Sequence, residues 1–136
     1  MEIAFGTDES TGLTAAIVER LRRGGHRVEV LADGDPWPDV GRIVGEAVVS
    51  GRAARGVVCC HTGTGVSIAA NKVAGVRAAL CTDAATAEGA RRWNDANVLA
   101  IGLRLTSEDV AAEMLDAFLS AEPDADELAT IAQVER

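Results

Sequence analysis

Aromatic residues are scarce in this chain, whose 136 residues include no tyrosine, two phenylalanines and two tryptophans. The hydrophobic fraction is nevertheless 48%, so alanine, valine, leucine and isoleucine must fill the core. The length is sufficient for one domain with a substantial core but not for two. We therefore expect one domain with an aliphatic interior.

Other absences exclude whole classes of function. The chain lacks an excess of basic residues, and its net charge of −8 argues against nucleic acid as a partner, since phosphate binding needs a basic surface. No stretch approaches the length of a membrane span, and no basic-then-apolar leader opens the chain, so a cytoplasmic protein with no membrane partner is expected. Neither a CxxC motif nor a histidine pair is present, which argues against a metal site.

Three cysteines are present, Cys59, Cys60 and Cys81, and three cannot pair completely. Cys59 and Cys60 are adjacent, so on a strand their side chains point to opposite faces. A disulfide framework is therefore not expected.

Apolar β-branched stretches alternate along the chain with segments of helical periodicity. The strands are predicted over 2–6, 26–31, 55–60, 77–81 and 98–101. The helices are predicted over 13–23, 40–50, 67–72, 84–93, from an N-cap at Ser107 to 119, and over 126–136. This alternation predicts an α/β domain over residues 1–121, with a five-stranded parallel sheet covered on both faces, followed by an acidic tail over 122–136.

The most informative segment is the polar, glycine-rich run from Cys60 to Gly65, which lies where the third strand ends and a helix begins. Open α/β sheets place their ligands at such points. Glycines let the backbone approach a ligand closely, and the free N–H groups of a helix start favour an anion. The thiolate form of Cys60 would be favoured there. The alternative is a tight turn with a buried structural thiol.

Two other strand ends carry polar clusters, Thr7–Glu9 and Thr82–Asp83, and all three are expected at one edge of the sheet. The segment Trp93–Asn97 precedes the fifth strand and falls at the opposite edge. It could reach the Cys60 turn only from a second subunit.

These residues resemble the ribose-5-phosphate isomerase B family, which includes the galactose-6-phosphate isomerase subunits. The resemblance covers residues 1 to about 119 and rests on the segments 60–72, 75–81 and 94–102. It implies a Rossmann-like three-layer α/β/α sandwich, a homodimer or tetramer with sites at the subunit interface, and no cofactor. It also implies aldose–ketose interconversion of a sugar through an enediolate, with the tail packing on the partner.

The resemblance also implies roles for particular residues. Cys60 resembles the base, the N–H groups of the turn that begins at His61 resemble the anion hole, and Thr62 resembles a hydroxyl used in sugar ring opening. Asp8 and Asn94 resemble residues that hold sugar hydroxyls, and Arg104 resembles a phosphate ligand, with Asn94 and Arg104 expected from the partner. The remaining candidates for substrate contact are Glu9, Gly63, Thr64, Gly65, Ser67 and Trp93.

Several positions depart from the family pattern. Glu9 stands where the family has a phosphate-binding histidine, and Trp93 where it has a ring-opening histidine. His61 replaces a glycine and is a candidate substitute acid, while Trp37 replaces a tyrosine as either a lid or a loop anchor. The acidic tail lacks the family's arginines, which leaves Arg104, with Arg91 or Arg92 as candidate helpers.

These departures predict an isomerase with a cysteine base and an altered substrate, a small sugar that is unphosphorylated or carries its anion elsewhere. One alternative is an epimerase or lyase that moves a proton next to a carbonyl. Another is a non-catalytic sugar-binding relative. The sequence leaves all three open.

Overall fold

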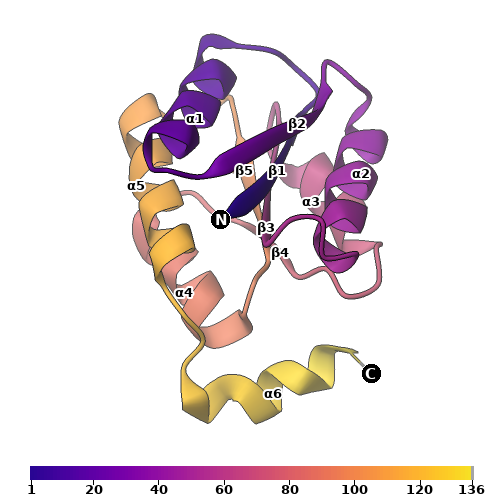
Figure 1. Cartoon of the computed structure of the whole chain (residues 1–136), viewed down its shortest axis with the longest axis vertical. Helices are drawn as coiled ribbons and strands as arrows, with labels where there is room; N and C mark the ends of the chain where they lie inside the picture. The colour runs from indigo at the N-terminus through magenta and orange to yellow at the C-terminus, as the bar shows by residue number, and fades with distance from the viewer. Residues whose placement is uncertain (136) are drawn as a thin grey trace.

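Five parallel strands form the centre of the structure, in the order β2-β1-β3-β5-β4, and the computed structural model describes residues 1–135 (Figure 1). The strands are β1 (Glu2–Thr7), β2 (Arg27–Asp33), β3 (Arg55–Cys60), β4 (Ala78–Leu80) and β5 (Val98–Gly102). Every neighbouring pair is parallel. The predicted α/β class and the five-stranded parallel sheet are therefore confirmed.

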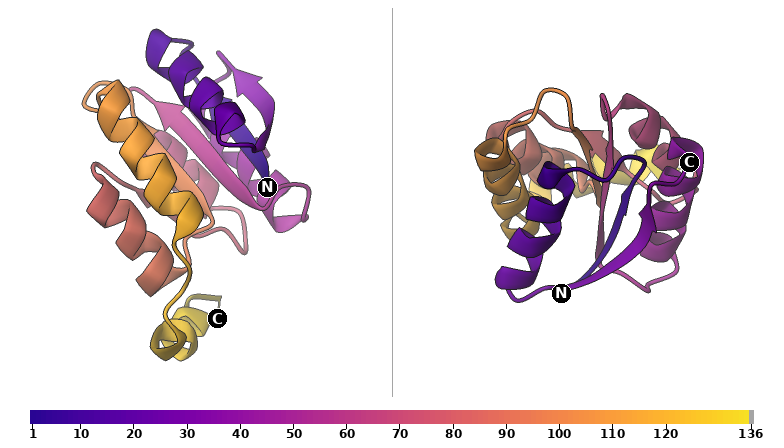
Figure 2. Two further views of the ribbon diagram at one scale, coloured as in Figure 1. Left: turned by 60° about the vertical axis from the view of Figure 1, so that its left-hand side comes forward. Right: turned by 90° about the horizontal axis from the view of Figure 1, so that it is seen from above.

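Helices cover both faces of the sheet, which gives three layers (Figure 2). One face carries α1 (Gly12–Arg23), α4 (Ala84–Asn94) and α5 (Glu108–Ser120), and the other carries α2 (Trp37–Val49) and α3 (Thr64–Asn71). Alternate residues of β3 point to opposite faces of the sheet. Cys59 packs in the core beneath α1, α4 and α5, and Cys60 packs in the core beneath α2 and α3. The expectation that these two thiols point in opposite directions is confirmed.

Two helices begin earlier than their periodicity predicted. Helix α2 begins at Trp37, with Pro36 as its N-cap and Pro38 in its first turn, because proline is tolerated where N–H groups have no helical partner. Helix α3 begins at Thr64, so the last two residues of the glycine-rich run are already helical. The N-cap at Ser107 is confirmed, since its side chain accepts from the N–H of Val110 at 3.2 Å.

The tail beyond α5 crosses one end of the body and stands apart from the two helical layers (Figure 1). Its helix, α6 (Leu128–Ala132), is shorter than the predicted 126–136 because the 3₁₀ turns η1 (Ala125–Glu127) and η2 (Gln133–Glu135) flank it; Arg136 lies outside the described residues. The tail contacts its own chain, where Asp124 pairs with Arg92 at 3.1 Å and Glu135 with Arg77 at 2.6 Å. Packing of the tail on a partner stays a prediction.

Residues 1–135 contain no helix that is long and apolar enough to cross a membrane. The same residues bring together no group of three or more His, Cys, Asp or Glu side chains that could hold a metal ion.

Candidate active site

The candidate site lies where β1 and β3 end side by side. The chain leaves β1 for one face of the sheet, through α1, and leaves β3 for the other face, through α3. Such a switch point is where open α/β sheets bind ligands. The N–H of Asp8 donates to the carbonyl of Cys59 at 3.2 Å, which ties the two strand ends together. Asp8, Glu9 and the Cys60 turn therefore share one edge.

The third polar cluster, Thr82–Asp83, does not join this site. It follows β4, which is separated from β3 by β5. The Asp83 carboxylate instead caps α4, accepting from the N–H of Thr86 at 2.7 Å. All three clusters lie at the carboxyl edge of the parallel sheet, as expected, but only Thr7–Glu9 and the Cys60 turn follow neighbouring strands.

Gly63 shapes the turn after Cys60. Its φ of +79° is a left-handed conformation, and a Cβ there would lie 2.5 Å from Leu80 Cδ1 and 2.8 Å from the Gly102 nitrogen, so no side chain fits. As the N-cap of α3, Gly63 offers no side chain to the first N–H groups of the helix. Only a long contact of 3.4 Å joins the Thr64 N–H to Thr62 Oγ1. The helix start is therefore free to receive an anion.

The side chains of the turn differ in exposure. His61, Thr62 and Thr64 are exposed, and Ser67 is half-buried. The backbone N–H of Ser67 donates to the Gly63 carbonyl at 3.2 Å. Three of these side chains can therefore reach a ligand without rearrangement.

The loop after β5 fixes the turn from the other side. The N–H of Leu103 donates to the Cys60 carbonyl, and the N–H of Arg104 to the His61 carbonyl, both at 2.9 Å. Arg104 is exposed and forms no ion pair within residues 1–135. The expectation that a partner must bring Arg104 to the turn is wrong, because β5 lies directly beside β3 in the same chain.

The three thiols have different surroundings. Burial raises the pKa of the Cys59 thiol far above its ordinary value, with smaller contributions from Cys60 and Asp8. Burial, with the nearby Asp83 carboxylate, raises the pKa of Cys81 to about 11. Both are therefore disfavoured as thiolates. Cys60 is 5% exposed and is the thiol at the end of β3, packed in the same core as residues of α3.

Asp8 is an unusual carboxyl group, because its Oδ1 atom is buried without a hydrogen-bond partner among residues 1–135. Burial, and then the charge of Glu9, raise the pKa of Asp8, while its backbone hydrogen bond and His61 act in the opposite direction. Asp8 therefore keeps its proton to a higher pH than an ordinary aspartate. In its neutral form it can donate a hydrogen bond to a ligand oxygen.

Trp93 and Asn94 lie at the opposite edge of the sheet, at the end of α4. The neighbouring Asn97 accepts at its carbonyl from the N–H of Gly56, near the start of β3. Trp93 is 52% exposed and, with Asn94 and Leu80, lines a groove of about 440 Å³ along β4 and α4. Within one chain Trp93 and Asn94 lie at the edge opposite to the Cys60 turn, as the sequence predicted.

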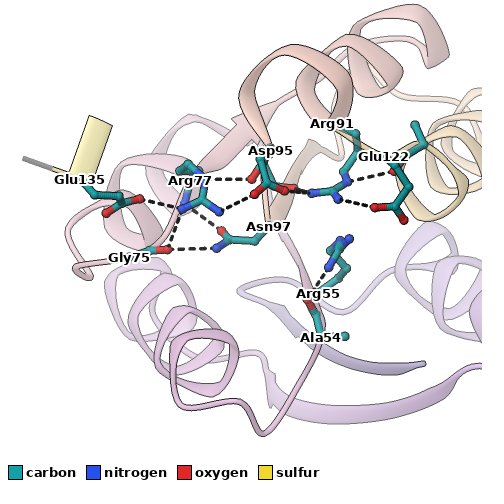
Figure 3. Close-up of polar contacts among 11 residues, drawn as sticks. Ala54, Arg55, Gly75, Arg77, Arg91, Asp95, Asn97, Glu122 and Glu135 are labelled. Atoms are coloured by element: carbon teal, nitrogen blue, oxygen red, sulfur yellow. Dashed lines mark hydrogen bonds and ion pairs between the residues drawn. The ribbon is translucent and has the colours of Figure 1, made fainter. Parts of the chain in front are cut away.

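A cluster of arginines that sequence reasoning missed lies at this same edge (Figure 3). Arg91 is 1% exposed and donates to Asp95 at 2.8 Å and to the Ala96 carbonyl at 2.7 Å. Arg77 donates to the carbonyl and carboxylate of Asp95 at 2.8 and 3.2 Å, and Arg55 Nε is buried with no partner among residues 1–135. The only sequence signal was the four-residue spacing of Arg91 and Asp95.

The two arginines of α4, Arg91 and Arg92, are both engaged by partners within their own chain. Arg91 also donates to the Ala121 carbonyl at 3.2 Å, so it joins the end of α4 to the start of the tail. Arg92 is held by two hydrogen bonds of 3.1 Å to Asp124. Neither guanidinium is free, so the expectation that they help Arg104 bind phosphate is not supported within one chain.

Comparison with known proteins places the chain in a family. A family model described as Ribose/Galactose Isomerase matches residues 3–134. The chain is 36% identical over 128 residues to the D-erythrulose-4-phosphate isomerase of Pectobacterium atrosepticum, covering 90% of this chain and 84% of that protein. It is 39% identical over 128 residues to the ribose-5-phosphate isomerase B of Escherichia coli K12, covering 89% and 85%.

A solved structure agrees with both sequence matches. The ribose-5-phosphate isomerase B of Clostridium thermocellum superimposes with a TM-score of 0.91 at 38% identity, covering 99% of this chain and 95% of that one. The fold, its Rossmann-like character and the family match therefore agree over nearly the whole chain. The chain belongs to the ribose/galactose isomerase family of sugar-phosphate isomerases.

Proposed function

We propose that the protein interconverts an aldose and a ketose with Cys60 as the base. The observation that carries this proposal is the position of Cys60, at the end of β3 and one short turn before a helix start whose N-cap residue, Gly63, offers no capping side chain. Acid–base catalysis and preorganised donors for a developing oxyanion are the two requirements of this chemistry.

In the proposed reaction, the Cys60 thiolate takes the proton from the carbon beside the carbonyl. The C–H bond breaks, an S–H bond forms, and the electron pair moves onto the carbonyl oxygen to give an enediolate. The N–H groups of residues 63–65 stabilise this oxygen. Cys60 then returns the proton to the neighbouring carbon, and the hydroxyl proton moves between the two oxygens. His61 is exposed beside the turn and is the group proposed for that transfer, with Thr62 next to it.

We propose that the substrate carries less negative charge at its tail than a pentose phosphate, or carries it elsewhere. Arg104 is an exposed residue whose backbone lies beside the turn, and Glu9 adds a carboxylate at the same edge. The tail offers carboxylates, three of which already pair with Arg77, Arg91 and Arg92. A phosphate dianion would lose charge-assisted contacts worth about 1.5–3 kcal/mol each.

One relative suggests a specific substrate class. The Pectobacterium atrosepticum protein is named a D-erythrulose-4-phosphate isomerase. A four-carbon sugar phosphorylated on its last hydroxyl cannot close a five- or six-membered ring, so its isomerisation needs no ring-opening acid. This fits Trp93, an indole with no acid–base function. We therefore propose an open-chain sugar that carries its anion elsewhere than a pentose 5-phosphate does. Tetrose and tetrulose 4-phosphates are the first candidates, because their phosphate lies one carbon closer to the carbonyl.

We also propose that two subunits share each site, with Asn94 of one reaching the Cys60 turn of the other. Two observations support this. Asn94 lies at the edge of its own sheet that is opposite to the Cys60 turn, and it lines a groove with the half-exposed Leu80 and Trp93. A closing partner would complete the pocket.

A panel of aldoses, ketoses and their phosphates, assayed beside the Cys60→Ala variant, tests the reaction. We expect turnover of an open-chain substrate that the variant loses, and product analysis separates isomerisation from epimerisation or cleavage. Undiminished turnover by Cys60→Ala would refute the proposed base.

Mixing two inactive variants, Cys60→Ala and Asn94→Ala, tests the shared site. Exchange of subunits should restore about a quarter of the wild-type activity, because each hybrid dimer has one intact site. An active monomer, or no recovery after verified exchange, would refute the shared site.

A further inference from the structure

The indole of Trp37 lies directly on Gly65, the second residue of α3. A Cβ built on Gly65 would come within 2.9 Å of Trp37 Cδ2 and 3.0 Å of Cε3. Trp37 is itself the first residue of α2 and is 44% exposed. Its ring therefore packs on the segment that carries the proposed anion hole, although the two residues are 28 positions apart in the sequence.

Backbone conformation does not explain the glycine at position 65. Gly65 is not among the glycines with positive φ, and it lies inside a regular helix. Alanine would suit that backbone better, because it is the stronger helix former. The feature that excludes a side chain at this position is the indole of Trp37.

The first turn of α3 is held from two sides. Gly63 lies against Leu80 and the end of β5, and Gly65 lies under Trp37. One turn further along, α2 and α3 are in close contact, since a Cβ on Gly41 would lie 2.5 Å from Ala69 Cβ. The backbone contacts at Gly63 and Gly41 are rigid, whereas the contact at Gly65 depends on one side chain.

We propose that Trp37 is a positioning residue, whose indole holds the first turn of α3 so that its N–H groups face the reacting oxygen. The expected effect on catalysis rests on the proposed function. The contact between Trp37 and Gly65 is independent of it. Donors of an oxyanion hole act through fixed geometry, and the loss of one costs about 10²–10³ in kcat. A shift of a few tenths of an ångström in the whole turn should therefore lower kcat by about tenfold.

A double-mutant cycle in urea tests the contact without an activity assay. Gly65→Ala should lower the urea midpoint of the wild-type protein, because the new methyl group displaces the indole. In the Trp37→Ala background the same change should be neutral or raise the midpoint, because only the helix preference remains. Gly12→Ala is the matched control: Gly12 also begins a helix, and a Cβ there meets nothing within 4 Å. Equal effects of Gly65→Ala in both backgrounds would overturn the proposal.

Kinetics and thiol labelling test the positioning role. Trp37→Ala and Gly65→Ala should each lower kcat about tenfold with little change in KM, and Trp37→Phe should recover most of it. The rate at which iodoacetamide alkylates Cys60 at pH 7 should fall about threefold in both variants, a readout that needs no known substrate. A Trp37→Ala protein that loses stability but keeps kcat and the Cys60 alkylation rate would reduce Trp37 to a structural anchor and overturn the proposal. If the wild-type protein turns over none of the tested sugars, but Cys60 alkylation still slows in both variants, the result would count against the proposed function and not against the positioning role of Trp37.

Discussion

Replacing Arg91 by methionine should destabilise the protein far more than the same change at its neighbour Arg92. Methionine is a long apolar side chain, so it removes the charge and the hydrogen bonds of Arg91 with a small loss of volume. Arg91 is 1% exposed, whereas the Arg92 side chain is 43% exposed. Both arginines make ion pairs, and burial is what distinguishes them.

The magnitude follows from the partners that Arg91 leaves behind. The buried Ala96 carbonyl loses its donor at 2.7 Å, and the partly buried Ala121 carbonyl loses its donor at 3.2 Å. An unsatisfied buried acceptor costs about 1–3 kcal/mol, and a partly buried one costs less. Asp95 loses its 2.8 Å contact but keeps Arg77, and Glu122 is too exposed to contribute much. The total should therefore approach the cost of breaking a buried ion pair, about 3–5 kcal/mol, a value comparable to the loss of two hydrogen-bond partners.

We therefore expect Arg91→Met to lower the free energy of unfolding by about 3–5 kcal/mol, equivalent to about 10–15 °C in Tm for a chain of this size. Arg92→Met should cost about 0–1 kcal/mol. Urea denaturation at several protein concentrations gives both values and separates folding from subunit association. A difference between the two variants of less than about 1 kcal/mol would refute the reasoning.

Three other outcomes concern the site. Cys60 should be alkylated ahead of Cys81 in the native protein at neutral pH, since burial and a nearby carboxylate raise the pKa of Cys81 to about 11; peptide mass spectrometry after short iodoacetamide pulses would reveal the opposite order if the argument is wrong. Asp8→Asn should raise stability at pH 7. Because the pKa of Asp8 is raised in the folded protein, its neutral form is favoured by folding and its ionised form is disfavoured. The stability of the folded protein is therefore fully retained below the ordinary pKa of aspartate and falls as the pH rises through the raised value. The advantage in Tm should therefore vanish near pH 4, and an advantage that is constant from pH 4 to 7 would contradict this account. Ribose 5-phosphate should be turned over weakly, and Glu9→His combined with Trp93→His should improve it; an unmodified kcat near the enzyme median of about 10 s⁻¹ would show that the pocket is not altered as proposed.

Local sequence patterns were sufficient to predict most elements of the fold. The run of β-branched residues before Cys60 predicted β3 with its exact bounds of Arg55–Cys60, because strand preference and burial act on neighbouring residues. The start of α2 was misjudged: the helix was predicted from residue 40, but it begins at Trp37, between Pro36 and Pro38. Proline breaks a helix interior but suits a first turn, and periodicity alone does not distinguish the two positions.

Long-range placement was beyond the same reasoning. Arg104 was assigned to the wrong side because an alternation of strands and helices does not specify that β5 lies between β3 and β4. Arg55, Arg77 and Arg91 are spread over three elements, and their partners Glu122 and Glu135 come from the tail. Only the folded topology brings them together, so no local motif marks them.

The division of the site among separate loops has an evolutionary consequence. The thiol and the glycine-rich turn belong to β3 and α3, whereas Glu9 and Arg104 lie on two other loops at the rim, and the proposed shared site would add Trp93 from a partner. Exposed rim positions tolerate substitution with little effect on stability, because few buried contacts depend on them. A lineage with this scaffold can therefore exchange one sugar for another by single-residue changes at the rim, while the proton-transfer chemistry is inherited unchanged.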